Sequence, residues 1–226
     1  MVTLPRCLEI FSAVLQKENR LVLVPPEDFQ RAAVLIPLIY RNSEWFLLFT
    51  RRAENVRHHP GQISFPGGRV DESDENIVYT ALRETHEELG IEEVEILGCI
   101  DDIVTISQYI VTPVVGVVNE DRVSPNNINR SEIDYVLEAP LSHLSNPDFF
   151  SLKTREWREM TFEVPFFDYN GEIIWGATGR ILVDLLNKLC LLNTDCQVEL
   201  FEKNQWKIQE LPIKDLETLK EFGFIH

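Results

Sequence analysis

Short apolar segments separated by turn residues recur along most of the chain. They are rich in Val, Ile and Phe and are bounded by Pro, Gly or Asn, a pattern typical of β-strands. We therefore expect strands at residues 32–40, 44–50, 62–65, 94–104, 108–118, 132–138 and 171–175. Helical spacing predicts amphipathic helices at 5–17 and 176–189, with Trp175 packing the sheet against the second of them. Residues 121–130 are typical of a polar loop.

A further helix, which ends near Gly90, carries the most informative side chains. Glu84, Glu87 and Glu88 are spaced by three and one, so they span an arc of roughly 100° on one side of the helix. Three carboxylates repel one another, and helix formation alone gives no reason to collect them. A divalent cation such as magnesium does, because it binds carboxylate, water and phosphate oxygens. The alternative is a solvated acidic face with ordinary ion pairs, which is common on charged helices.

The rest of this helix is consistent with one buried and one open face. A mostly apolar stripe, centred roughly 140° from the glutamates, consists of Val78, Leu82, Thr85 and Leu89. Ser73 and Asp74 are expected as N-cap residues, and Gly90 as the glycine that ends the helix. Arg83 precedes Glu87 by four residues, so we expect it to orient that carboxylate and to lower the repulsion.

Residues 67–91, GGRVDESDENIVYTALRETHEELGI, resemble the Nudix box. That motif is written as Gly, five residues, Glu, seven residues and then REUXEEXGU, where U is aliphatic. Apart from Thr85 at an aliphatic position, the second half matches at Arg83, Glu84, Glu87, Glu88, Gly90 and Ile91. The first half departs from the pattern, because Asp74 replaces the Glu and eight residues separate it from Arg83. We interpret Asp74 as a helix cap, with Glu84, Glu87 and Glu88 as the metal-binding residues.

Residues 47–68, LLFTRRAENVRHHPGQISFPGG, resemble the extra signature of the coenzyme A pyrophosphatase branch, of the form LLTXR, a spacer, R and GXXXFPGG. The residues that fill it are Thr50, Arg51, Arg57, Gly61, Phe65, Pro66, Gly67 and Gly68. The resemblance covers roughly residues 30–190. It implies an α/β fold, an α/β/α sandwich around a mixed β-sheet, and a single Nudix domain over residues 1–226. The extension at about 191–226 is unassigned: either an edge hairpin with a helix near 213–222 or a homodimer contact.

Charge narrows the class of substrate. The chain has 21 basic and 37 acidic residues, a net charge of −16, which disfavours broad contact with DNA or RNA. A small anionic substrate then needs local cations, and Arg51, Arg52, Arg57 and Arg69 lie near the double glycine. Arginine suits phosphate because its planar guanidinium donates paired hydrogen bonds. We expect phosphate contact from Arg51 first; the alternative for all four is ordinary surface charge.

Composition indicates a cytoplasmic protein. No apolar run approaches the roughly 20 residues of a membrane span, so no membrane partner is expected. The N-terminal residues lack the basic and apolar regions of a secretory signal. Four scattered cysteines without a CXXC pair indicate free thiols in a reducing compartment.

The resemblance implies metal-dependent hydrolysis of the pyrophosphate bond of coenzyme A or acyl-coenzyme A, with Mg²⁺ or Mn²⁺ as cofactor. The products are 3′,5′-ADP and 4′-phosphopantetheine or its acyl form. Gly67 and Gly68 allow the backbone to approach the substrate closely. The catalytic base is either Glu84, acting through the metal, or Glu132. Two alternatives remain: the same chemistry on ADP-ribose or NADH, and a catalytically silent module that binds nucleotides or a partner protein.

Overall fold

The structure is a computed structural model that describes residues 12, 15, 20–157 and 160–191, and the side chains of 157–162 and 190–191 are not described. Most of the predicted helix at 5–17 and all of the segment at 192–226 therefore lie outside the described residues. None of the helices within the described ranges is long and apolar enough to cross a lipid bilayer.

Within the described residues, the larger sheet has eight strands and is mixed, as the resemblance implies. Its strands are β1 (Gln30–Arg41), β2 (Glu44–Arg52), β3 (Ile63–Ser64), β4 (Gly67–Arg69), β5 (Val94–Cys99), β6 (Ile103–Val104), β7 (Tyr109–Val118) and β8 (Ile133–Pro140). β1 and β7 pair in parallel, whereas the other strand pairs described in this sheet are antiparallel. Within the predicted strand at 94–104, residues 100–102 interrupt the pairing, so β5 and β6 are separate.

β1 and β2 separate beyond their hairpin, and the double glycine Gly67–Gly68 lies between them. The two strands pair near their hairpin, from Leu38–Leu47 to Arg41–Glu44, and then diverge. β3 pairs with β2 at Thr50 and Arg51, and β4 pairs with β1 over residues 32–34. The segment between 62 and 69 thus fills the gap between the two strands, which fixes Gly67 and Gly68 inside the sheet.

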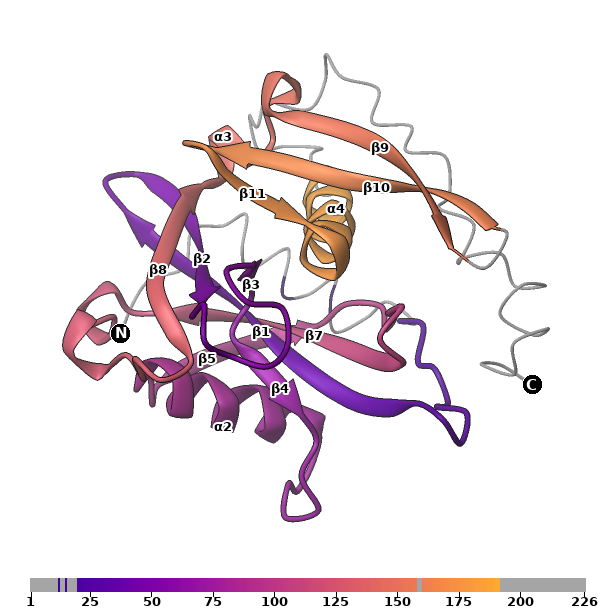
Figure 1. The fold of residues 1–226 in the computed structure, drawn as a ribbon. Coiled ribbons are helices and arrows are strands. Elements are labelled where there is room, and N and C mark those ends of the chain that lie inside the picture. Colours follow the sequence, from indigo (N-terminus) through magenta and orange to yellow (C-terminus); the bar gives the residue numbers. More distant parts are fainter. Residues whose placement is uncertain (1–11, 13–14, 16–19, 158–159, 192–226) are drawn as a thin grey trace.

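One helix covers each face of this sheet (Figure 1). Alternate residues of β1 point to opposite faces, as strand geometry requires. Ala33 and Leu35 pack with Ala81 of α2 (Ile77–Leu89), whereas Ile36 and Leu38 belong to the same core as Leu182 of α4 (Gly176–Leu191). The predicted α/β class, with helices on both sides of a mixed sheet, is confirmed.

A second, three-stranded antiparallel sheet packs on α4 (Figure 1). It consists of β9 (Phe150–Trp157), β10 (Met160–Tyr169) and β11 (Glu172–Trp175). β9 and β10 were not predicted, because most of β9 is exposed and its sequence, FSLKTREW, lacks the apolar alternation of a half-buried strand. The interpretation of Trp175 was wrong: its side chain is 38% exposed and stacks on Phe166, with 5.6 Å between ring centroids.

Short helical turns complete the fold. The predicted polar loop contains two 3₁₀ turns, η1 (Glu120–Arg122) and η2 (Pro125–Asn127). α3 (Leu141–Leu144) and η3 (Pro147–Phe149) connect β8 to β9. Cys99 is half-buried and carries a free thiol, and burial raises its pKa.

Candidate active site

Helix α2 begins two or three residues later than an N-cap at Asp74 or Ser73 requires. Asn76 is the N-cap residue, and its side-chain oxygen accepts a hydrogen bond of 3.0 Å from the amide of Tyr79. At the other end, Gly90 has the left-handed φ of 67° expected of a helix-ending glycine, and its amide donates to the carbonyl of His86. The predicted C-terminus is therefore correct, and the predicted N-cap is wrong.

Asp74 instead binds Arg83. Its carboxylate accepts hydrogen bonds of 2.8 Å from Nε and 3.0 Å from Nη2 of Arg83, and one of 2.8 Å from the Thr80 hydroxyl. The Asp74 side chain has no exposed surface. The Arg83 guanidinium holds the pKa of this carboxyl well below its usual range. The residue that departs from the Nudix motif is thus the anchor of the arginine inside that motif.

The remaining face of Arg83 contacts two of the glutamates. Its Nη1 lies 2.9 Å from Glu84 Oε1 and 3.2 Å from Glu87 Oε1, and Nη2 donates to the carbonyl of Arg69 at 3.0 Å. The hydrogen bonds to Asp74, followed by those to Glu84 and Glu87, raise the pKa of Arg83. One arginine therefore neutralises part of the acidic cluster and ties the helix to the strand that carries the double glycine.

The three glutamates differ in burial. Glu87 is exposed, Glu84 is half-buried, and Glu88 is only 4% exposed. The buried face of α2 consists of Thr80, Ala81, Thr85, Glu88 and Leu89. It is rotated relative to the predicted stripe, because Val78 and Leu82 are only partly buried. Glu88 thus belongs to the inner face of the helix, between the sheet and the site.

Burial changes the protonation of the two inner glutamates. Desolvation is the largest cause of the pKa shift in both, since it disfavours the ionised form. It raises the pKa of Glu88 to about 8, against the opposing charge of Arg52 and the amide of Gly67. Glu84 is also shifted upward, although the hydrogen bond from Arg83 opposes the change. Oε2 of Glu88 is buried without a hydrogen-bond partner.

The double glycine touches Glu84 directly. A Cβ atom built on Gly68 would lie 2.5 Å from Oε2 of Glu84, so any side chain at position 68 would displace this carboxylate. Gly67 has a φ of 153°, and its own Cβ would lie 2.6 Å from Cα of Val34. Gly67 is therefore required by the backbone of β1, whereas Gly68 leaves room for the carboxylate of Glu84.

Glu132 joins the α2 glutamates Glu84 and Glu88 in the carboxylate cluster of the site. It is exposed and lies in the turn before β8, and its negative charge contributes to the raised pKa of both Glu84 and Glu88. Residues far apart in the sequence are thus brought together, with Glu84 and Glu88 from α2 and Glu132 from the β8 side.

The donor set suits a hard divalent cation. Carboxylate oxygens are the preferred ligands of magnesium, and a buried, unpartnered carboxylate oxygen such as Oε2 of Glu88 needs either a cation or a proton. As the side chains stand, no three His, Cys, Asp or Glu within the described ranges are arranged to hold a metal ion. Two of the three α2 glutamates, Glu84 and Glu87, contact Nη1 of Arg83.

The four arginines near the loop have different surroundings. Nη1 of Arg52 lies 4.0 Å from Oε1 of Glu88, and its Nε donates to the carbonyl of His58 at 3.2 Å. Arg51 is paired at 2.7 Å with both Glu54 and Asp134. The side chains of Arg57 and Arg69 are exposed. Of the two consecutive arginines, Arg52 rather than Arg51 lies beside a Nudix-box glutamate.

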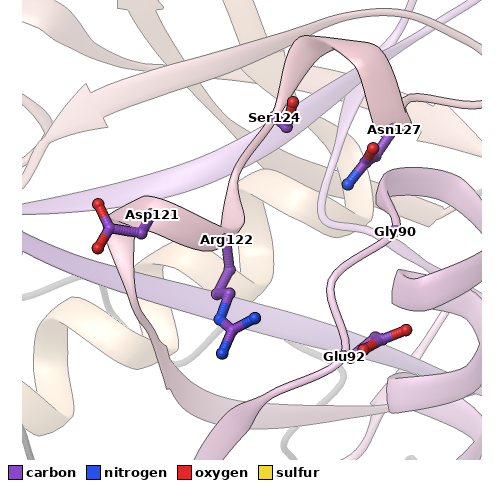
Figure 2. A pocket seen from close by; sticks show the side chains of 6 residues that line it. All are labelled: Gly90, Glu92, Asp121, Arg122, Ser124 and Asn127. Carbon is purple, nitrogen blue, oxygen red and sulfur yellow. The ribbon is translucent and has the colours of Figure 1, made fainter.

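A separate surface pocket of about 230 Å³ lies between the end of α2 and the 3₁₀ turns (Figure 2). It is lined by Gly90, Glu92, Asp121, Arg122, Ser124 and Asn127. None of the three α2 glutamates of the Nudix box lines it, and Arg122 is paired with Glu93 at 2.7 Å. Its mixed charge does not favour a phosphate ligand, so the chemistry is assigned to the carboxylate cluster.

Comparison with known families agrees with this geometry. The NUDIX domain family matches residues 29–164, more than half of the chain and the whole of the site described above. The chain belongs to the Nudix family. Nudix hydrolases are enzymes that use divalent metal ions, in agreement with a site built from carboxylates.

Sequence relatives cover most of this Nudix hydrolase. A protein named uncharacterized Nudix hydrolase NudL, from Enterobacter sp. (strain 638), is 36% identical over 81% of this chain and 93% of its own length. The protein of the same name from Yersinia pestis (strain Pestoides F) is 38% identical over 72% and 81%.

Solved structures give lower similarity. A MutT/nudix family protein from Enterococcus faecalis has 14% identity and a TM-score of 0.49 over 84% of this chain and 76% of that one. The C. elegans Ap4A hydrolase has 19% identity and a TM-score of 0.39 over 50% and 81%. Both TM-scores are below 0.5, so the family assignment rests on the sequence matches.

Proposed function

We propose that this Nudix hydrolase cleaves the pyrophosphate bond of coenzyme A or acyl-coenzyme A, with Mg²⁺ or Mn²⁺ as cofactor. The products are 3′,5′-ADP and 4′-phosphopantetheine or its acyl form. The proposal of this substrate class is supported by the signature at residues 47–68, which resembles that of the coenzyme A pyrophosphatases. It is compatible with the family match, which extends over the same residues.

One observation carries the proposal: the signature segment is attached to the carboxylate cluster at both of its ends. At the β2 end, Arg52 lies beside Glu88 and holds the carbonyl of His58 in the loop. At the β4 end, Gly68 lies against the carboxylate of Glu84. A substrate contacted by the signature loop is therefore placed next to the acidic cluster, as hydrolysis at a diphosphate requires.

Each group of site residues has its own proposed role. Glu84, Glu87 and Glu88 hold the cation, which supplies positive charge against the diphosphate and makes the attacking water more acidic. Arg52 donates hydrogen bonds to a phosphate group, with Arg51, Arg57 and Arg69 as further cations of the binding surface. Glu132 accepts the proton of the attacking water, because it lies beside the cluster while its side chain stays exposed. Gly67 and Gly68 let the backbone approach the substrate.

A magnesium-dependent assay with coenzyme A, acyl-coenzyme A, ADP-ribose and NADH tests the proposal. We expect the highest kcat/KM on one of the two coenzyme A substrates, and chelation with EDTA to abolish turnover. A higher kcat/KM on ADP-ribose or NADH would show that coenzyme A is not the substrate class. Absence of turnover on all four would favour the silent nucleotide-binding module. The variant Glu132→Gln is expected to lower kcat by about 10²-fold or more, with little change in metal affinity measured by calorimetry.

A further inference from the structure

The turn that carries Glu132, residues 129–132, is hydrogen-bonded to helix α2 on one side and to the end of strand β2 on the other. Its first residue, Asn129, donates its amide hydrogen to the carbonyl of Glu88 at 2.9 Å. At its other end, the carbonyl of Glu132 accepts a hydrogen bond of 2.7 Å from the amide of Ala53, directly after Arg52. The turn therefore bridges the last turn of α2 and the end of β2, which contribute Glu88 and Arg52.

Asn129 also stabilises the turn from within, through hydrogen bonds to its backbone and side-chain oxygens. Its carbonyl accepts hydrogen bonds from the amides of Glu132 at 3.1 Å and Ile133 at 2.9 Å. Its side-chain Oδ1 accepts from the amide and the hydroxyl of Ser131, at 3.2 and 2.6 Å. An asparagine that bonds the backbone two residues ahead stabilises a turn in one conformation. Ile133, which follows the turn, is fully buried and fixes its exit.

These hydrogen bonds fix the position of the Glu132 backbone. Glu132 is exposed, so the position of its carboxylate depends mainly on where the backbone places the residue. Its placement beside Glu84 and Glu88 is thus set by its backbone, and the backbone is set by the turn. Because proton transfer depends on placement to within about an ångström, loss of the turn is costly to the chemistry.

We propose that Asn129 is a positioning residue for the reaction: through Oδ1 it holds the turn that places the carboxylate of Glu132 against the Glu84–Glu88 pair. The inference rests on the proposed function, because Glu132 matters only if it accepts the proton. It adds a residue outside the Nudix box and outside the signature segment. Its role is to act through Glu132, without contact to the substrate.

The test compares three variants. Asn129→Ala removes the acceptor, Asn129→Asp keeps it, and Asn126→Ala is the control, since Asn126 lies in the same loop with an exposed side chain. For Asn129→Ala we expect kcat to fall about tenfold or more, with KM and the calorimetric affinity for Mg²⁺ within about twofold of the parent protein. Asn129→Asp should recover kcat to within about threefold, and Asn126→Ala should leave it unchanged.

A second measurement is independent of turnover. In the metal-free protein, hydrogen exchange of the Glu132 and Ile133 amides is expected to accelerate about tenfold or more in Asn129→Ala, whereas the amides of α2 keep their rates. Unchanged exchange would overturn the inference whichever substrate is used.

The outcomes separate this inference from the proposed function. If Glu132→Gln is inactive while Asn129→Ala turns over normally, the inference is wrong and the function stands. Equal impairment of Asn129→Ala and Asn129→Asp, or a loss of Mg²⁺ affinity as large as the loss of kcat, also overturns it. If Glu132→Gln keeps its kcat, the base is wrongly assigned and the positioning role falls with it, while hydrolysis itself is unaffected.

Discussion

The guanidinium of Arg83 is held by the carboxylate of Asp74 through two hydrogen bonds, of 2.8 Å from Nε and 3.0 Å from Nη2. The Asp74 side chain is fully shielded from solvent, whereas that of Arg83 is partly exposed. The pair therefore fixes one side of Arg83 and leaves Nη1 directed at Glu84 and Glu87. Asp74 decides where the positive charge beside the acidic cluster lies.

We expect Asp74→Asn to destabilise the metal-free protein by about 2 kcal/mol, because a hydrogen-bonded charged pair loses its anion. Urea unfolding at pH 7 measures the change. Asp71→Asn is the matched control, since that residue is exposed and its carboxylate accepts hydrogen bonds from Ser73. Equal effects of the two substitutions would contradict the role of Asp74.

The raised pKa of Glu88 predicts how stability depends on pH. Its value of about 8 in the folded protein lies above the ordinary value of 4.5, so folding favours the protonated form. The stabilisation is complete below pH 4.5 and is lost as the pH rises through about 8. We expect the metal-free protein to lose stability, roughly 3 to 4 kcal/mol, between pH 5 and pH 8 through this group.

Glu88→Gln should remove most of this pH dependence, because the amide has no proton to lose. Urea unfolding in EDTA at pH 5, 6.5 and 8 measures it, with Glu87→Gln as control because Glu87 is exposed. A slope that is the same in the parent protein and in Glu88→Gln would show that Glu88 is not the group responsible.

Much of the fold is predictable from apolar periodicity. The long strands β1, β2, β7 and β8 and the helix α2 are strongly patterned because each packs one or both faces in a core. β9 is not predicted because most of its side chains, including Lys153 and Arg155, are exposed. Its sequence therefore lacks the alternation of apolar and polar residues that a half-buried strand shows. The sequence pattern reports which residues are buried, and it is weakest where a strand lies at the surface.

At the site, sequence spacing identifies the glutamates and not their surroundings. The spacing of Glu84, Glu87 and Glu88 places them on one side of α2, but their different burial depends on how the helix is rotated on the sheet. The role of Asp74 depends on a loop whose path no local pattern predicts. The turn at Asn129 did have a local signal, an Asn followed two residues later by Ser in a polar loop.

The contact between Gly68 and Glu84 predicts a loss of function without a loss of folding. In Gly68→Ala the new methyl group overlaps the end of a flexible side chain, which can move at little cost to stability. The carboxylate of Glu84 is then displaced from the cluster. We expect kcat/KM to fall about 10²-fold, and Mg²⁺ affinity by calorimetry to fall with it, while the melting temperature stays within a few degrees.

Gly67→Ala is the contrasting variant. Its methyl group would overlap the backbone of β1, at a φ that L-residues rarely adopt. We expect it to destabilise the protein by about 3 kcal/mol or more, seen as a lower urea midpoint. If Gly68→Ala is instead the less stable of the two, the distinction between side-chain and backbone contact is wrong.

The two consecutive arginines of β2 are expected to affect substrate binding unequally. Arg51 is engaged by Glu54 and Asp134, whose side chains are 69% and 50% exposed, so its ion pairs contribute about 1 kcal/mol or less. Arg52 lies beside the buried Glu88, and its Nε donates a hydrogen bond to the carbonyl of His58 in the loop. Arg52→Ala should therefore raise KM about tenfold or more, and Arg51→Ala about threefold or less, in steady-state assays at constant ionic strength. Arg52→Lys keeps the charge but loses the planar donor pair, so it should recover only part of the affinity. A larger effect of Arg51→Ala would restore the order expected from the signature alone and would place the phosphate on the opposite face of β2.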